Sequence, residues 1–543
     1  MLAIGSGLAS RYLGAMKTPR VPAFARCALG LLMALGACGR EAGAVDSAVF
    51  HRHADAPGID WFDGDVGAAF EAARRAGKPL LLYWGASWCP PCQQLKATVF
   101  SRADFIARSR LFVAVYLDGD DEGAQKWGEQ FRVLGYPTVV VLDADRHELM
   151  RIAGGMDLDQ YATVLDTALA HLEPANALLA AAARGRMLDA GQCRRLAFNS
   201  WELDPDAAAA ASATLAQQLE TAAGRCPAGE RLERARLLVF AASYGAQSES
   251  AALRIQQAPS VALRHQLTAV GQLLTDERTA VDAADALQSL DLDAFRAVKA
   301  MPEAFHWLAH YDAVMDAAAG DPDFAEADQL GAIGSKLTAL KTIKGAIPAG
   351  AARAARARVA AALAESQAPY VRSGIINAVL PIFDALGQND QAYRVVQAEL
   401  GSTATPYYYK ADLGELAERL GLRDEALRWY AEGYAEAQGP ATRFQWGRTY
   451  VLGLLRLRPE ATDLIQTVTS QVLGELDGTD RIYRRARLSL VRLDQGLRNW
   501  NTASPATRHA AIAALHERMR QICVKIPATE AARASCDAFL DGA

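Results

Sequence analysis

The sequence predicts an α/β domain built on a mixed sheet, followed by a large region made only of helices. Between Ile59 and about Pro174, short apolar runs typical of strands alternate with amphipathic segments typical of helices. After Pro174 the strand-like runs end, and alanine-rich segments with helical spacing continue along the chain. A length of 543 residues also exceeds what one hydrophobic core supports, which favours at least two folding units.

Periodicity places the individual elements of the α/β segment. The expected order is a helix over 66–78, a strand over 79–86, a helix over 89–100, a strand over 111–118, a helix over 123–134, strands over 138–145 and 148–154, and a closing helix over 158–172. Strands joined by helices and by one hairpin imply a central mixed sheet with helices on both faces. We therefore place an α/β domain at 58–174.

The remaining residues, 175–543, are predicted to form an α-helical, solenoid-like region. Apolar residues in this region recur at the helical period, and Gly, Pro or Asp separates one helix from the next. A break at Lys344–Ala352 could divide the region into two lobes near 345–350.

One internal repeat is visible within the helical region. The pair Leu386-Gly387 recurs as Leu420-Gly421, and 420 − 386 = 34, which is the tetratricopeptide period. The segment at about 373–440 therefore resembles tetratricopeptide repeats.

Charge and composition limit the class of protein. The chain has 57 Lys and Arg against 62 Asp and Glu, a formal net charge of -5, and no basic block. Nucleic-acid-binding domains usually carry a basic patch, so we predict no nucleic-acid partner. The 51% share of hydrophobic residues, much of it alanine, favours an ordered and mostly helical protein.

The N-terminus is typical of an export signal. Arg20 and Arg26 precede the apolar run Cys27–Ala37, which is shorter than the roughly 20 residues that span a bilayer. We interpret 1–37 as a signal peptide, and Met16, which opens the basic stretch MKTPR, could be the true start.

The end of this apolar run resembles the lipobox of bacterial lipoproteins. Leu35-Gly36-Ala37-Cys38 has a branched residue, two small residues and a cysteine. The resemblance implies that Cys38 is acylated, that 38–57 is a linker, and that the protein is lipid-anchored in the bacterial cell envelope on the periplasmic side. The alternative is an ordinary signal peptide cleaved near Ala37 or Ala42.

No metal or cofactor is expected. His51 and His53 lie in the linker, where two histidines are usually solvated. The acidic stretch Leu117–Gly123 lacks the alternating ligands of a calcium loop and is interpreted as a solvated loop. The tyrosines of Tyr407–Lys410 could form an interaction patch, but packing against a neighbouring repeat is favoured.

Export affects the interpretation of the cysteines, because thiols in an oxidising compartment tend to form disulfides. Four cysteines lie downstream of the first domain and allow three pairings. Proximity in sequence favours structural disulfides Cys193–Cys226 and Cys523–Cys536.

The most informative motif is Cys89-Pro90-Pro91-Cys92, which follows a predicted strand and opens a predicted helix. Unpaired N–H groups and the dipole at a helix start favour a thiolate, so Cys89 is the expected nucleophile. Cys92, one turn later, is placed to resolve the mixed disulfide that such an attack forms. The pair is therefore the candidate redox-active disulfide.

The residues around this motif resemble the thioredoxin superfamily. The stretch Trp88–Cys92 after GKPLLLYWGAS, and Gly135–Thr138 before an apolar strand, are most similar to the C-terminal thioredoxin-like domain of bacterial thiol:disulfide interchange proteins. The resemblance implies an α/β thioredoxin fold, a cis Pro137 beside the cysteines, and a Tyr136 backbone that binds an extended substrate. It also implies that Trp88 covers the active-site surface. The alternatives are an ordinary trans turn at Pro137 and a plain core aromatic at Trp88.

One departure from the family and the two intervening prolines bear on the chemistry of the cysteine pair. Many family members carry a buried aspartate six residues before the nucleophilic cysteine, where this chain has Tyr83. Water, Tyr83 or Glu129 would then have to accept the Cys92 proton. Pro90 and Pro91 remove N–H donors that would stabilise the Cys89 thiolate, which favours a reducing potential.

We therefore expect an exported thiol–disulfide oxidoreductase of the protein-disulfide reductase type. Its predicted partners are proteins that bear disulfides and, as the resemblance implies, a membrane thiol relay as electron donor. The alternative is a cell-envelope scaffold or binding lipoprotein whose thioredoxin-like domain is redox-inactive.

Overall fold

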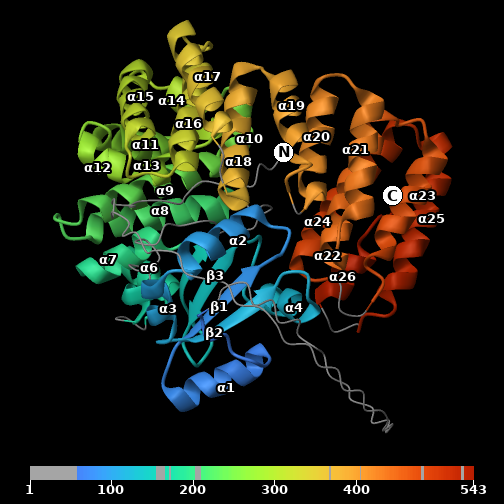
Figure 1. The fold of residues 1–543 in the computed structure, drawn as a ribbon, viewed down its shortest axis with the longest axis horizontal. Coiled ribbons are helices and arrows are strands. Elements are labelled where there is room, and N and C mark those ends of the chain that lie inside the picture. The colour runs from blue at the N-terminus through green and yellow to red at the C-terminus, as the bar shows by residue number, and fades with distance from the viewer. Residues whose placement is uncertain are drawn as a thin grey trace, which may run out of the picture.

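The computed structural model describes residues 58–153, 165–169, 173–201, 209–365, 368–403, 405–478, 482–527 and 531–542. The predicted signal peptide, Cys38 and the histidines of the linker lie outside the described residues. Figure 1 shows the α/β unit lying against helices that curve around it from α6 to α26. The predicted fold class, an α/β unit followed by a large helical region, is confirmed.

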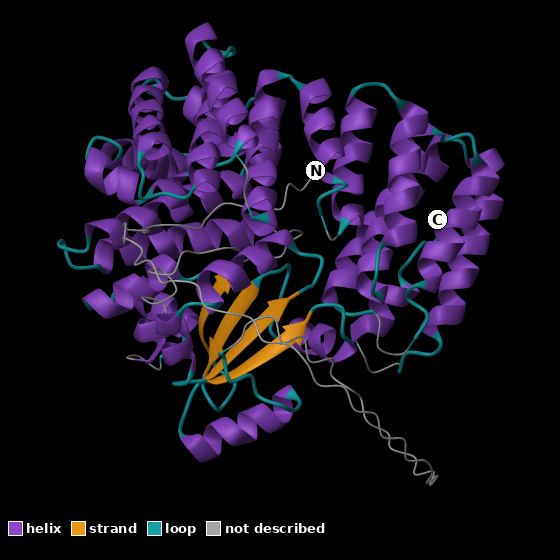
Figure 2. Ribbon diagram, viewed as in Figure 1, coloured by secondary structure: helices purple, strands orange, loops and turns teal. Residues whose placement is uncertain are grey.

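The α/β unit contains a four-stranded mixed sheet (orange in Figure 2). Its strands are β1 (Leu80–Gly85), β2 (Val113–Asp118), β3 (Thr138–Leu142) and β4 (Glu148–Ala153). The strand order is β2-β1-β3-β4, with β1 parallel to β2 and β3 antiparallel to both β1 and β4. All six residues of β1 and all five of β3 are buried, as expected of central strands.

Local signals explain where the helices of this unit begin and end. The α/β unit contains α1 (Val66–Ala76), α2 (Pro90–Leu95), a π-helical turn η1 (Lys96–Phe100), α3 (Ala103–Ser109) and α4 (Glu122–Gln130). Asp65 caps α1 by accepting a hydrogen bond from the Ala68 N–H, and Gly77 ends α1 with a left-handed φ of 62°. Helix α3 was not predicted, because its seven residues have no side-chain cap and span barely two turns.

The two faces of the sheet enter different cores, since successive side chains of a strand point to opposite sides. Leu80, Leu82 and Trp84 share one buried cluster with residues of α1 and α4. Leu81 and Tyr83 belong to a second cluster that also contains residues of the first helices of the helical region. The sheet is therefore covered partly by its own helices and partly by later ones.

The helical region consists of helices joined mostly by short turns. Its helices are α6 (Ala175–Ala183), α7 (Ala190–Phe198), α8 (Ala209–Arg225), α9 (Arg231–Ser248), α10 (Ser250–Arg254), α11 (Val261–Leu273), α12 (Glu277–Asp282), α13 (Ala284–Leu287), α14 (Leu292–Lys299), α15 (Ala304–Gly320), α16 (Glu326–Lys344), α17 (Ala349–Ala364), α18 (Pro369–Leu386), α19 (Asn389–Glu399), α20 (Pro406–Arg419), α21 (Arg423–Glu436), α22 (Pro440–Leu457), α23 (Thr462–Gly474), α24 (Arg484–Ala503), α25 (Pro505–Cys523) and α26 (Ala531–Asp537). None of the described helices is long and apolar enough to cross a membrane.

Core packing is continuous across the predicted division near 345–350. Ile343 and Ala355, on either side of it, belong to one buried cluster that extends from α9 to α21. A separate cluster, which begins at Leu427 and includes residues up to Leu540, occupies the last helices. The change from one core to the next therefore falls near α21 and α22.

Two disulfides join neighbouring helices of this region. Cys193 on α7 is bonded to Cys226, directly after α8, and Cys523 at the end of α25 is bonded to Cys536 on α26. All four cysteines are buried, which places these bonds inside the helical cores.

Candidate redox site

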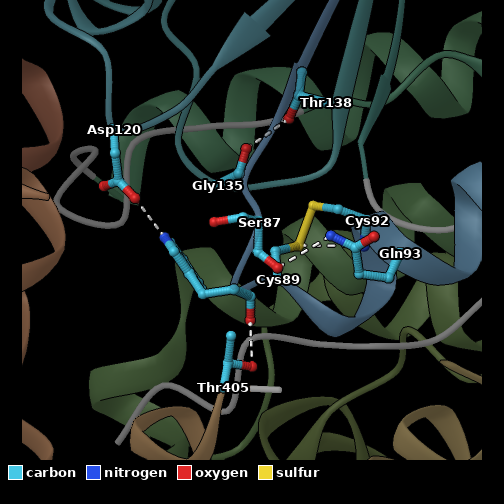
Figure 3. The surroundings of a disulfide bond; sticks show 9 residues. Ser87, Cys89, Cys92, Gln93, Asp120, Gly135, Thr138 and Thr405 are labelled. Atoms are coloured by element: carbon cyan, nitrogen blue, oxygen red, sulfur yellow. Dashed lines mark hydrogen bonds between the residues drawn. A yellow bond between two sulfur atoms is a disulfide. The ribbon is translucent and has the colours of Figure 1, made fainter. Parts of the chain in front are cut away.

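The structure joins Cys89 and Cys92 in a disulfide at the start of α2 (Figure 3). Strand β1 leads into this turn, and Cys89 is the cap residue of the helix, with Pro90 and Pro91 in its first turn. The Cys92 N–H donates to the Cys89 sulfur over 3.2 Å. The sulfur of Cys89 therefore has one local N–H donor, as expected for the candidate nucleophile at a helix start.

Pro137 lies at the same end of the sheet as the disulfide. Its peptide bond with Tyr136 is cis. Thr138, the next residue, pairs with Trp84 of β1, only a few residues before Cys89. The Tyr136 hydroxyl donates to the Gly119 carbonyl over 2.9 Å, so the side chain of Tyr136 is held against the loop after β2.

The Trp88 ring is buried between two parts of the chain. Its side chain is held on the domain side, where Trp88 Nε1 donates to Asp120 Oδ2 over 2.7 Å. On the other side, its ring lies edge-on to Trp446 of α22, with centroids 5.5 Å apart. Only 7% of Trp88 is exposed, so the surface that it was expected to cover is itself covered.

Asp120 connects the disulfide turn to the helical region. Besides the Trp88 indole, its carboxylate accepts a hydrogen bond from the Thr442 hydroxyl over 2.6 Å. Burial raises the pKa of Asp120 above its usual value, and the nearby charge of Arg485 opposes that rise. The interpretation of the 117–123 loop as simply solvated is wrong for this residue, because the loop is packed against α22.

The helical region covers both sulfur atoms. Ala86, Trp88, Cys89 and Cys92 form one buried cluster with three residues of the helical region, Tyr407, Ala437 and Trp446. The exposed fraction is 2% for Cys89 and 0% for Cys92. Thr405 also contacts this turn, since its hydroxyl lies 3.5 Å from the Trp88 carbonyl (Figure 3). A protein substrate has no open path to the disulfide in this arrangement.

Two arginines of α24 border the covered site. Arg487 forms a two-pronged ion pair with Glu129 of α4, with both N–O distances at 2.6 Å. The Arg485 guanidinium lies over the rings of Trp88 and Tyr136, 5.2 and 4.9 Å from their centroids. Glu129, a candidate proton acceptor in the sequence, is therefore engaged in an interface ion pair.

This geometry agrees with the comparison to known families. Residues 66–169 match the family model of the thioredoxin-like domain. The solution structure of a thioredoxin from Thermus thermophilus is similar, with 24% identity, 21% of this chain and 88% of that chain covered, and a TM-score of 0.19. No curated protein is significantly similar to the chain in sequence. A thioredoxin-like domain with a closed Cys89–Cys92 pair suggests thiol–disulfide oxidoreductase activity.

An aromatic cluster fills the interior of the thioredoxin-like domain at the position of the family's aspartate. Tyr83 is fully buried, edge-on to Phe100 with centroids 4.9 Å apart. Trp61 and Tyr116 also contact the Tyr83 ring, and the buried Lys96 lies over Tyr116. The tyrosine that stands in place of the aspartate is thus part of a packed core.

Sequence reasoning missed the residues that the helical region contributes to the site. Thr442, Trp446 and Arg485 carry no motif, and more than 300 positions separate them from the cysteines. Tyr407 packs against Trp446 of a neighbouring helix, as favoured for these tyrosines, but its place in the buried cluster around the disulfide was not predicted. Among the described residues, no group of three or more His, Cys, Asp or Glu side chains could hold a metal ion.

Proposed function

We propose that this protein is an exported thiol–disulfide oxidoreductase that reduces disulfides in protein substrates through Cys89 and Cys92. The observation that carries the proposal is the Cys-x-x-Cys pair at a strand-to-helix junction, in a domain that matches the thioredoxin-like family and has a cis Pro137 at the same end of the sheet.

The exchange proceeds in two steps. In the reduced protein, the Cys89 thiolate attacks one sulfur of a substrate disulfide, forms a mixed disulfide and releases the other substrate sulfur as a thiolate. The Cys92 thiolate then attacks the Cys89 sulfur, closes the Cys89–Cys92 bond and releases the second substrate sulfur. The substrate gains two electrons and two protons in total. An external dithiol must return them to the pair before another cycle.

The remaining parts of the proposal rest on sequence patterns. The signal peptide and lipobox support a periplasmic location with a lipid anchor at Cys38, and the resemblance to thiol:disulfide interchange proteins supports a membrane thiol relay as donor. The Tyr136 backbone would hold an extended substrate segment. The tetratricopeptide-like segment near 373–440 would contact a protein partner.

The first test measures dithiothreitol-driven insulin reduction by the full chain. We expect slow but measurable turnover that falls to background in Cys89→Ser, because that variant lacks the attacking thiolate. A pre-reduced Cys92→Ala variant, mixed with insulin after dithiothreitol is removed, should accumulate mixed disulfides, since it lacks the internal thiol that resolves them. As a control, the double variant Cys523→Ser, Cys536→Ser removes a disulfide outside the site and should keep turnover.

One observation favours the second candidate function, a redox-inactive scaffold. Both sulfurs of the pair are buried beneath the helical region, as a permanently closed structural disulfide would be. The absence of turnover, together with a Cys89–Cys92 bond that resists dithiothreitol, would support this function instead.

A further inference from the structure

A defined set of residues in the helical region covers the Cys89–Cys92 disulfide. The relevant surface is defined by residues of α20, α22 and α24 and of the turn after α21, and we call it the cap: Tyr407, Ala437, Thr442, Trp446, Arg485 and Arg487. Thiol–disulfide exchange requires one sulfur to reach another, so its rate depends on access. Cys89 is only 2% exposed and shares a buried cluster with Tyr407, Ala437 and Trp446 of the cap.

The cap is held together by contacts within the helical region. The Trp446 indole donates to the Tyr407 carbonyl over 2.7 Å, and the two rings lie edge-on with centroids 5.8 Å apart. Helices α21 and α22 also approach closely here, because a Cβ added at Gly433 would lie 3.3 Å from the Trp446 ring. The cap can therefore keep its shape when it separates from the thioredoxin-like domain.

The polar contacts that join the cap to the domain lie around the disulfide. Thr442 donates to Asp120, Arg487 pairs with Glu129, and Arg485 lies on the rings of the domain. The Arg487 and Glu129 side chains keep 17% and 30% exposure, so water reaches this ion pair. Partly exposed ion pairs contribute modestly to stability. Such a pair can therefore break and re-form at low cost when the cap leaves the domain and returns.

We propose that the cap is an autoinhibitory lid, which must move away from Trp88 and Asp120 before Cys89 can exchange with a substrate. The consequence for turnover rests on the proposed function, but the closure itself does not. In the closed form, the lid excludes both reductants and protein substrates. In the open form, the Cys89 sulfur and the Trp88 ring become accessible together.

The test reverses one charge of the interface in the full chain. We expect Arg487→Glu, which faces Glu129, to raise the rate at which dithiothreitol reduces Cys89–Cys92 about tenfold, equivalent to about 1.4 kcal/mol in the opening equilibrium. Rates are followed by acid quenching, alkylation and peptide mass spectrometry. The swapped pair Glu129→Arg, Arg487→Glu should return the rate close to that of the natural protein. Circular dichroism checks that each variant is folded.

Two further variants keep the test decisive. Arg394→Glu makes the same charge change in an exposed pair with Asp390 on α19 and should leave the rate unchanged. Thr442→Val removes only the hydrogen bond to Asp120 and should give a smaller increase than Arg487→Glu.

An unchanged reduction rate in both Arg487→Glu and Thr442→Val would overturn the lid, as would a swapped pair that stays as fast as Arg487→Glu. If Arg487→Glu opens the disulfide to dithiothreitol but insulin is still not reduced, the lid stands and the proposed function fails.

Discussion

At the residue scale, Asp120 shows how one carboxylate serves two parts of the molecule. It accepts hydrogen bonds from Trp88, the residue before Cys89, and from Thr442 of the helical region. Both bonds compensate for its partial removal from water, since a buried charge without partners is costly. The result is one of the polar contacts that join the helical region to the disulfide turn.

The pH dependence of stability should reveal this carboxylate. Burial raises the folded-state pKa of Asp120 above its ordinary value of 3.8, although Arg485 acts in the opposite direction and Asp118 adds a like charge. The contribution of Asp120 to the free energy of unfolding is therefore fully present below pH 3.8, where the carboxyl is protonated in both the folded and the unfolded state. It is lost as the pH rises through the raised folded-state pKa. Asp120→Asn cannot ionise, so its free energy of unfolding should improve relative to the natural protein over this range. Urea titrations at several acidic pH values measure the difference, and parallel pH profiles would argue against a raised pKa.

At the element scale, close packing of helices α20 and α21 positions Tyr407 for its contact with the disulfide turn. Gly414 of α20 lies against the ring of Tyr430 of α21, and a Cβ at Gly414 would overlap that ring. The Tyr430 hydroxyl donates to Glu418 over 3.1 Å, which holds the ring in place. The absence of a side chain at Gly414 thus sets the distance between the two helices.

Adding a side chain at Gly414 should push helices α20 and α21 apart. We expect Gly414→Ala to lower the free energy of unfolding by about 1–3 kcal/mol, because the overpacked Tyr430 ring cannot easily move. Gly224→Ala is the matched control: Gly224 lies in α8, where a new Cβ would meet nothing within 4 Å beyond its own stretch of helix. That control should be neutral or stabilising by up to about 1 kcal/mol, because alanine favours helix. Denaturant unfolding compares the two, and equal effects would contradict the packing argument.

At the scale of the whole molecule, the thioredoxin-like domain and the first helices after it share one core. Leu149 and Ile152 of β4 are buried with Leu178 of α6 and Leu196 of α7. Arg195 of α7 is also buried and donates to the Leu149 carbonyl over 2.6 Å. The sheet is therefore joined to the helical region by apolar packing and by a buried hydrogen bond.

A chain that ends at residue 174 should consequently fold poorly. It would expose the apolar face of β4 to water and lose the Arg195 hydrogen bond, whereas a chain that ends at 248 keeps α6 to α9 over the sheet. We expect the shorter chain to bind a hydrophobic dye and to lack a sharp thermal transition, and the longer one to melt cooperatively. A sharp transition in the shorter chain would show that the shared core is dispensable.

Much of the fold follows from local pattern. Periodicity and motif predicted helix α1, the buried strands β1 and β3, and the cysteine turn between strand and helix where the structure has them. Short α3 and the π-helical turn before it were missed, because neither has a cap or a period long enough to detect.

Local sequence pattern could not predict whether the sulfurs of Cys89 and Cys92 are accessible. The motif at a strand-to-helix junction made Cys89 and Cys92 candidate site residues, and the resemblance to a known family added Pro137. Whether a substrate can reach those sulfurs depends on contacts between residues 317 to 358 positions apart, such as Thr405 with Trp88 and Arg487 with Glu129. No periodicity or motif encodes such pairs, because they form only when the helical region has curved back over the domain. The sequence by itself therefore marks the cysteine pair as the candidate site, whereas the burial of the pair is a property of the folded chain.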